Sequence, residues 1–296
     1  MTDAIRPHHK IWPKRLPREL VVPKTSLFFN LEVAAARYPD KPAHIFFGQA
    51  MSYAQLKAQA EALAGWLQSA GVGKGDRVAL YMQNCPQFIV AVYGILRADA
   101  VVVPVNPMNR ADEFSHYITD PQSKAVICSA DLSGFVATAN AALPLAERVP
   151  QVLVTRYTDT MPDGALDPME APSALLETWL RAEHPLPAGF TRWTDALGAA
   201  RKPGPHTAGP DDLALLPYTS GTTGLPKGCM HTHATLGPRA RRALAVALQG
   251  DALDGDPDDG HRPVRKSQLQ ELRPEQPAQH RRRRCGHAAR GGAAIA

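Results

Sequence analysis

Between residues 26 and 236, short apolar runs alternate with stretches in which apolar residues recur every three or four positions. The runs have the length of buried strands, and the spaced stretches indicate amphipathic helices. Their regular alternation predicts an α/β fold with a mostly parallel sheet flanked by helices. The predicted strands span residues 43–47, 51–53, 77–82, 100–103, 124–128 and 151–155. The predicted helices span residues 27–38, 56–70, 86–97, 109–119, 131–143 and 173–181.

Local signals mark where several of these elements begin. Ser26 stands where a helix N-cap is expected, directly before an apolar-periodic stretch. Ser52 and Gln55 have the three-residue spacing of a capping box. Gly48-Gln49 lies between two strand-like runs and indicates a hairpin turn.

The pattern weakens between residues 156 and 210, where eight prolines and five glycines interrupt it. A short apolar cluster in this stretch contains Phe190, Trp193 and Leu197. We expect the stretch to be a surface excursion between the strand at 151–155 and a later apolar strand.

Composition changes after Leu236. Residues 237–296 hold 12 Lys and Arg against 7 Asp and Glu, which accounts for the net charge of +5, and none of the 19 aromatic residues. Such a segment buries too little apolar area to offset its ordering entropy, so a disordered tail is predicted. Arg281–Arg284 fit a nucleic-acid patch or a localisation signal. Because no aromatic residue accompanies them, we favour a reading-frame change after residue 236 and expect no nucleic-acid partner.

The rest of the composition indicates in which cellular compartment the protein is expected. Residues 1–25 are basic without an apolar run, so they are interpreted as a solvated leader and not as a secretory signal. No stretch approaches the ~18 apolar residues of a membrane-spanning helix. The four cysteines form no Cys-x-x-Cys pair, which indicates a reduced, cytoplasmic protein. Residues 26–236 remain as one predicted domain, whose oligomeric state the sequence leaves open.

The segment Tyr218–Gly228 carries the main candidate chemistry, with three glycines, a lysine and several hydroxyls after an apolar strand. Glycine takes positive φ, so successive backbone N–H groups can turn toward one anion, and Lys227 adds a compact positive charge. The common nucleotide loop is excluded because Pro226 separates Gly224 from Lys227. The alternative is a polar surface turn. The candidate phosphate-binding residues are Thr219, Ser220, Gly221, Thr222, Thr223, Gly224 and Lys227.

The letters YTSGTTGLPKG closely resemble the phosphate-binding signature of the acyl-adenylate-forming enzymes, which include acyl-CoA synthetases. Three upstream segments, residues 51–56, 75–80 and 103–107, are also similar to segments of that family, so the resemblance spans about residues 26–236. The resemblance implies the N-terminal part of the adenylate-forming fold, in incomplete form. It also implies that Thr219 helps to hold Mg²⁺, and that His233 orders the turn after the loop.

The implied activity is that of an ATP-dependent acyl-CoA ligase acting on a medium- or long-chain fatty acid or a related carboxylic acid. ATP, Mg²⁺ and coenzyme A are the implied cofactors and co-substrates, and small molecules are the implied partners. Aromatic or dicarboxylic acids are alternative substrates.

The chain departs from the family pattern in what it lacks. It contains no Tyr-Gly-x-Thr-Glu segment and no later Ser-Thr-Gly-Asp segment. The catalytic residues are therefore unknown, since the expected Glu and Lys fall outside the sequence. We expect this chain to be inactive as a ligase, and a non-catalytic nucleotide-binding fragment is the alternative.

Cys229, His231 and His233 alternate, so a strand would place them on one face. This suggests a Cys/His metal cluster, but neighbouring positions on one strand give poor tetrahedral geometry without a further ligand. We therefore favour an ordering role for His233.

Overall fold

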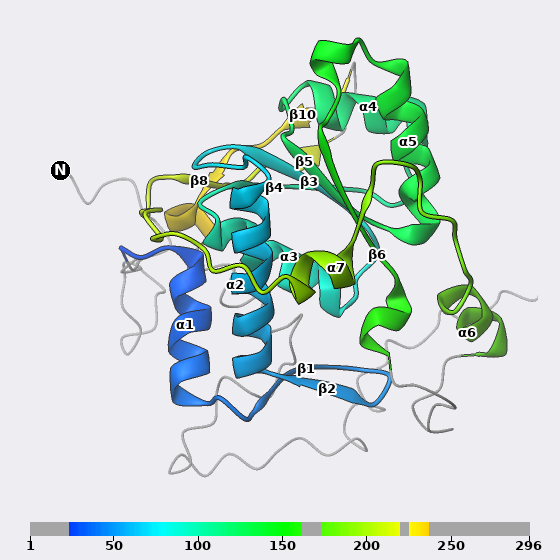
Figure 1. Ribbon diagram of the computed structural model, residues 1–296. Helices are drawn as coiled ribbons and strands as arrows, with labels where there is room; N and C mark the ends of the chain where they lie inside the picture. Colours follow the sequence, from blue (N-terminus) through cyan, green and yellow to red (C-terminus); the bar gives the residue numbers. More distant parts are fainter. Residues whose placement is uncertain (1–23, 162–172, 220–224, 237–296) are drawn as a thin grey trace, which may run out of the picture. The chain divides into compact units, whose positions relative to one another are not determined.

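The computed structural model describes residues 24–161, 173–219 and 225–236 of the chain. A seven-stranded sheet, in the order β11-β8-β4-β3-β5-β6-β7, runs through its middle (Figure 1). Every pairing in it is parallel except that of β11 with β8, which confirms the predicted mostly parallel sheet. The strands are β3 Arg77–Tyr81, β4 Val101–Val105, β5 Ala125–Ser129, β6 Gln151–Thr155, β7 Thr191–Arg192, β8 Leu213–Leu215 and β11 His231–Thr232.

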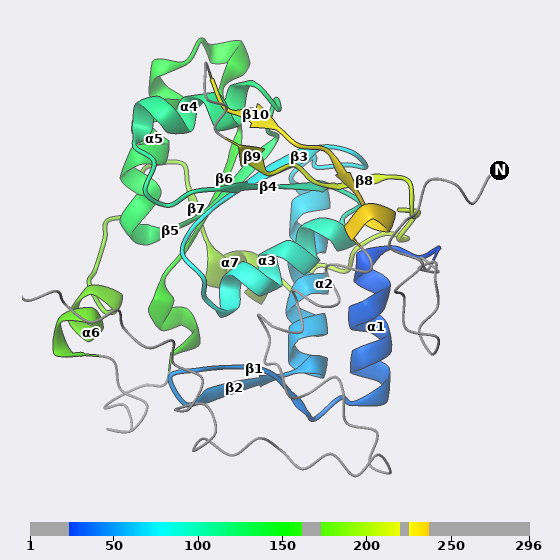
Figure 2. The same ribbon diagram turned by 180° about the vertical axis from the view of Figure 1, so that it is seen from behind.

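Helices cover both faces of this sheet (Figures 1 and 2). The helices α1 Leu27–Arg37, α2 Tyr53–Ser69, α3 Pro86–Arg97 and α7 Trp193–Gly198 lie on one side. The helices α4 Ala111–Thr119 and α5 Ser133–Ala142 lie on the other. Short helices are α6 Ala174–Leu180 and the 3-10 turns Ala130–Leu132, Leu145–Glu147 and Tyr157–Thr160.

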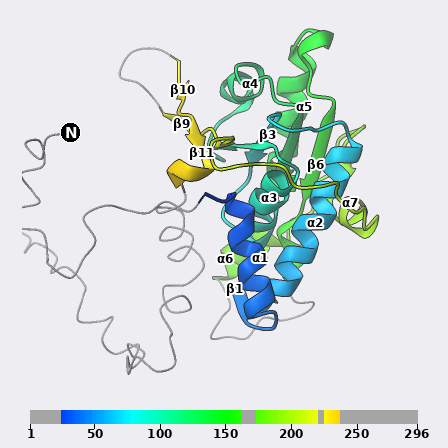
Figure 3. The ribbon, with the colours of Figure 1, turned by 90° about the vertical axis from the view of Figure 1, so that its left-hand side faces the viewer.

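Strand β3 shows why both faces are covered. Val78 and Leu80 pack into the cluster beneath α2 and α3, whereas Ala79 and Tyr81 pack into the cluster beneath α4 and α5. Successive side chains of a strand point to opposite faces, so a strand that is apolar at four consecutive positions, as β3 is from Val78 to Tyr81, needs a helix layer on each side. Figure 3 shows α1 beside α2, where it extends the first layer.

The predicted element starts are confirmed. Ser26 Oγ accepts a hydrogen bond from Phe29 N–H (3.4 Å) at the start of α1. Ser52 Oγ accepts from Gln55 N–H (3.3 Å), while Gln55 Oε1 accepts from Ser52 N–H (2.8 Å), which is the reciprocal capping box.

The predicted hairpin is present with its turn one residue earlier. Strands β1 Pro42–Phe46 and β2 Gln49–Ser52 pair antiparallel, and Phe46 lies opposite Gln49. The turn is therefore Phe47-Gly48, with φ of 46° and 79°. A two-residue turn with both φ values positive matches the twist of the flanking strands, and glycine meets that requirement at the second position.

The expectation that all of residues 156–210 form a surface excursion is wrong for its second half. Strand β7 pairs parallel with β6 and lengthens the main sheet. Trp193 and Ala196 of α7 are 3% and 1% exposed and belong to the core. Gly65 of α2 packs so closely on the backbone of Arg201 that a side chain there would overlap it. The excursion contains too few apolar residues for their pattern to reveal this docking.

The described residues all belong to one compact unit. None of the helices in the described ranges is long and apolar enough to cross a membrane. Nearly all of the predicted leader (1–25) and all of the predicted tail (237–296) lie outside the described residues.

Candidate functional site

The glycine-rich segment begins and ends in a short antiparallel hairpin. Strand β9 (Tyr218–Thr219) pairs with β10 (Lys227–Gly228). Thr219 lies opposite Lys227, and Tyr218 opposite Gly228. Of the candidate residues, Ser220, Gly221, Thr222, Thr223 and Gly224 lie outside the described residues.

One face of this hairpin carries the two described candidate residues. Directly opposed residues of an antiparallel pair place their side chains on the same face, about 4.5–5.5 Å apart at Cβ. Thr219 and Lys227 are both exposed. Cys229 Sγ is 3.7 Å from Thr219 Oγ1, and no ion pair to Lys227 occurs among the described residues. Where the chain enters and leaves the loop, the Thr219 hydroxyl therefore lies opposite the Lys227 ammonium, which has no ion-pair partner among the described residues.

The opposite face is closely packed. A Cβ on Gly228 would lie 3.1 Å from Leu216 Cδ1 and 3.3 Å from the Tyr218 ring. Such contacts are tighter than usual, so the last glycine of the motif lets the two strands lie flat against each other.

Helix α4 receives this packed face, and Figure 2 shows β10 beside it. The Tyr218 ring meets those of Tyr117 (centroids 5.0 Å apart) and His116 (5.6 Å) in edge-to-face geometry. The Tyr218 hydroxyl donates to Asp120, and His116 Nε2 donates to the Pro226 carbonyl (2.8 Å). Burial, followed by the Asp120 acceptor, raises the pKa of Tyr218.

The hairpin lies at the edge of the sheet where the parallel strands end, which is the usual position of ligand sites. Leu216 N–H donates to Val102 O (2.8 Å), and Cys229 N–H donates to Pro217 O (2.8 Å), so main-chain pairing continues from β4 through β8 to the loop. Strand β8 is parallel to β4, and the loop follows its carboxyl end. In open α/β sheets ligands bind in the crevice outside the carboxyl ends of the strands.

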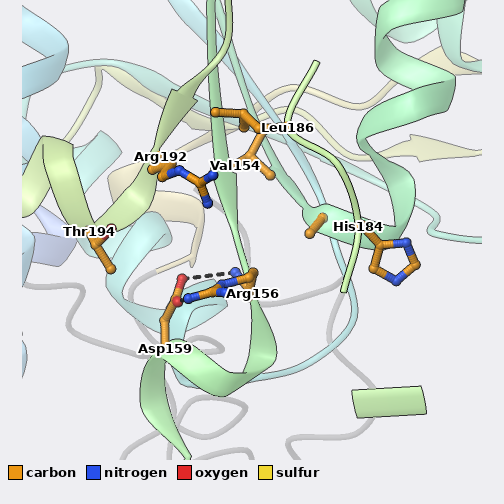
Figure 4. Close-up of a pocket in the computed structure, with 8 residues that line it drawn as sticks. Val154, Arg156, Asp159, His184, Leu186, Arg192 and Thr194 are labelled. Carbon is orange, nitrogen blue, oxygen red and sulfur yellow. Dashed lines mark hydrogen bonds and ion pairs between the residues drawn. The ribbon is translucent and has the colours of Figure 1, made fainter. Parts of the chain in front are cut away.

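A small hollow lies at the other end of the sheet from the hairpin, beside β6 and β7 (Figure 4). It is lined by Ala130, Val154, Arg156, Asp159, His184, Leu186, Arg192 and Thr194. Asp159 accepts from both the backbone N–H and the Nε of Arg156 (2.9 and 3.3 Å). The volume of this hollow, about 50 Å³, is far below the roughly 300–1,000 Å³ of small-molecule pockets, so a nucleotide does not fit there.

His233 connects the segment after the loop to the start of α1. It is 2% exposed, and its Nδ1 accepts a hydrogen bond from Leu27 N–H (3.0 Å). Next to it, His206 Nε2 lies 2.8 Å from Ser26 Oγ, and His206 Nδ1 lies 2.5 Å from Asp99 Oδ1. His233 thus satisfies a backbone N–H in the first turn of α1, which has no carbonyl partner within its own helix.

This contact bears on the possible metal cluster of Cys229, His231 and His233. Among the residues that the structure describes, no group of three His, Cys, Asp or Glu side chains lies close enough to hold a metal ion. Cys229 instead lies beside Thr219, on the face of the hairpin opposite Tyr218.

We expect His233 to make the protein less stable in mild acid. Burial, followed by the charges of His206 and Lys74, lowers the pKa of His233, and Asp212 and Asp99 oppose the shift; the net result is a pKa of about 4. The unfolded chain therefore binds a proton near pH 6.5 that the folded chain binds only near pH 4, so stability falls as the pH drops through that window. The expected loss in free energy of unfolding from pH 7 to pH 5, measured by urea denaturation, is about 1 kcal/mol.

In His233→Asn, Asn Oδ1 stands in for the accepting Nδ1 but does not titrate, so the loss should shrink. His184→Asn, which removes a half-buried histidine elsewhere, is the matched control and should keep it. An equal loss in His233→Asn and the unaltered protein would show that another group is responsible.

Comparison with known proteins shows which family this chain resembles. The family described as AMP-binding enzyme matches residues 31–259, past the composition change at residue 236. The long-chain-fatty-acid–CoA ligase of Bacillus subtilis (strain 168) is 33% identical over 248 residues, which is 82% of this chain and 42% of that protein. The long-chain-fatty-acid–CoA ligase of Escherichia coli O6:H1 is 33% identical over 235 residues, with coverage of 77% and 41%.

Among solved structures, the inhibitor-bound N-terminal domain of FACL13 from Mycobacterium tuberculosis is 28% identical with a TM-score of 0.53, over 71% of this chain and 44% of that one. The chain thus spans about two fifths of the length of the curated relatives that it matches. The family matches most of this chain, and the Bacillus subtilis relative is one third identical over four fifths of this chain. The chain therefore belongs to the AMP-binding enzyme family, as a member of the acyl-CoA synthetase type.

Proposed function

We propose that this chain carries the ATP-binding part of an ATP-dependent acyl-CoA ligase that activates a medium- or long-chain fatty acid or a related carboxylic acid. In the first step a carboxylate oxygen bonds to the α-phosphorus of ATP, and the bond to the bridging oxygen breaks, which releases pyrophosphate. In the second step the thiolate of coenzyme A attacks the acyl carbon and AMP leaves, giving the thioester. The names of the curated relatives support this choice of substrate class.

The observation that carries the proposal is the pairing of Thr219 with Lys227 on one exposed face of the hairpin. Phosphoryl-type reactions depend mainly on positioning and on neutralising charge. Lys227 has no carboxylate partner among the described residues, so its ammonium is available to the β- and γ-phosphates. Thr219 offers a hydroxyl oxygen suited to Mg²⁺, which when bound would supply further positive charge to the same phosphates. In this proposal Ser220–Gly224 contribute backbone N–H donors between them.

Lys227→Ala should weaken the binding of ATP with Mg²⁺ about 10- to 100-fold, because a hydrogen bond to a charged group contributes about 1.5–3 kcal/mol. Titration calorimetry of the full chain measures the dissociation constant. Lys57→Ala is the matched control, since Lys57 pairs with Glu61 on α2 (2.9 Å). An unchanged affinity in Lys227→Ala would contradict the proposed phosphate site.

A cytoplasmic location is part of the proposal. Cys85, Cys128 and Cys229 are free thiols. Burial raises the pKa of the Cys85 thiol to about 12, so it stays protonated and unreactive. Free thiols of this kind are typical of reducing compartments.

A further inference from the structure

On both sides of the glycine-rich segment the chain contacts the C-terminal end of α4, at His116 and at the C-cap residue Asp120. On the incoming strand, the Tyr218 hydroxyl donates to Asp120. On the outgoing side, the Pro226 carbonyl accepts from His116 Nε2 at 2.8 Å. His116 and Asp120 are four residues apart, so on a helix they lie one above the other on one face.

The hairpin needs such an anchor. Its two strands pair over two residues each, and an isolated two-stranded hairpin is at best marginally stable in water. The Tyr218 ring adds edge-to-face contacts with His116 and Tyr117, interplanar angles being 82° and 70°. Such aromatic contacts contribute about 0.5–1.5 kcal/mol beyond the area that they bury. The helix therefore supplies stability that the short strand pairing lacks.

We propose that His116 and Asp120 are positioning residues, which fix the separation of Thr219 and Lys227 and thereby set the affinity of these two side chains for a triphosphate. This inference rests on the proposed function. Neither side chain belongs to the sequence motif: Asp120 contacts the Tyr218 side chain, which lies on the face opposite Thr219, and His116 contacts the main chain at Pro226. Their effect on a ligand is therefore indirect, through the fraction of molecules in which the ends are correctly spaced.

The chemistry of the His116 contact suggests a variant that separates loss of the hydrogen bond from loss of the imidazole ring. The acceptor is a carbonyl, so His116 must donate from Nε2, and the amide nitrogen of glutamine can donate from nearly the same place. His116→Ala removes the donor, whereas His116→Gln keeps it without the ring. Tyr218→Phe removes the bond to Asp120 while it keeps the ring contacts.

The first measurement is hydrogen–deuterium exchange of the full chain without nucleotide, on peptides that cover residues 218–228. Exchange in these peptides should rise in His116→Ala and Tyr218→Phe and return most of the way to the unaltered level in His116→Gln, which keeps the donor but not the ring contact with Tyr218. His184→Ala, a half-buried histidine away from the loop, is the matched control and should leave it unchanged. Unaltered exchange in His116→Ala would overturn the proposed anchor, even if the protein bound no ATP.

The second measurement is the dissociation constant for ATP with Mg²⁺. Loss of one neutral hydrogen bond should raise it about three- to tenfold in His116→Ala, with recovery in His116→Gln and an unchanged midpoint of thermal unfolding. If exchange rises while the dissociation constant stays the same, α4 packs against the hairpin without positioning the site, and the proposal is wrong. Absence of ATP binding by the unaltered chain would count against the proposed function alone, since the exchange result stands by itself.

Discussion

Gly94→Val is expected to lower the free energy of unfolding by about 3 kcal/mol, because it overfills the contact between α3 and α2. A Cβ on Gly94 would lie 2.6 Å from Leu63 Cδ2 and 2.9 Å from Leu63 Cγ. Leu63 is fully buried, so it has no solvent side toward which to move. The branched side chain of valine adds two methyl groups to this overlap. Urea denaturation followed by circular dichroism measures the change.

A double-mutant cycle tests the cause. Leu63→Ala alone should cost about 2–5 kcal/mol through the cavity that it leaves. In the double variant the valine occupies part of that cavity, so the combined loss should be about 2 kcal/mol smaller than the sum of the two single losses. Gly134→Val on α5 is the matched control, because nothing lies within 4 Å of a Cβ there and the change should stay within about 0.5 kcal/mol. Strict additivity of Gly94→Val and Leu63→Ala would show that the two side chains do not compete for space.

Asp99→Ala is expected to cost about 4 kcal/mol, the largest effect predicted for a single polar side chain. Asp99 is 8% exposed, and its carboxylate accepts from Thr207 N–H (2.9 Å), Thr207 Oγ1 (2.7 Å) and Ala208 N–H (3.2 Å). Removing it takes the acceptor away from these part-buried hydrogen bonds, which costs about 1–3 kcal/mol. Asp99 also has φ of 61°, and alanine in that left-handed region costs about 1–2 kcal/mol more.

Two further variants separate these contributions. Asp99→Gly removes the carboxylate but takes the positive φ without strain, so it should be about 1 kcal/mol more stable than Asp99→Ala. Asp99→Asn keeps the shape and tolerates the conformation, so it reports on the charge and the acceptors. Asp211→Asn, at an exposed position nearby, is the control for loss of a carboxylate. Equal stability of the alanine and glycine variants would exclude the backbone contribution.

The ionisation of Asp99 adds a pH dependence. Burial by itself raises the pKa of this carboxyl, but the hydrogen bonds from Thr207 and Ala208 and the charge of His206 together hold the pKa below its usual value. The carboxylate therefore stabilises the fold at neutral pH, and its contribution is lost as the pH falls below about 4. This window lies below the one in which His233 acts, so the two residues can be distinguished by pH.

Local sequence patterns were sufficient to predict where most of the helices and strands lie. Helix α3 begins at Pro86 and ends at Arg97, as predicted, because proline suits the first turn and the apolar spacing continues to the last. The capping box of Ser52 and Gln55 likewise depends on residues only three positions apart. Such features are decided within one turn of chain, and the sequence displays them directly.

Non-local packing decided what the sequence could not reveal. Strand β7 exists because Thr191 and Arg192 pair with β6, and its two residues carry no strand pattern of their own. The motif identified Thr219 and Lys227 as candidates, but only the register shows that they face each other. His116 and Pro226 are 110 positions apart, and no periodicity links them.

The brevity of β7 and β11 also bears on how the molecule behaves among copies of itself. Within residues 24–161, 173–219 and 225–236, these two strands are the outermost members of the sheet, and each is two residues long. An approaching chain would find on either border only a few main-chain groups with which to extend the ladder. Very short border strands are one way in which natural sheets resist edge-to-edge aggregation. The same brevity that hid β7 in the sequence thus helps to keep the sheet from growing beyond one molecule.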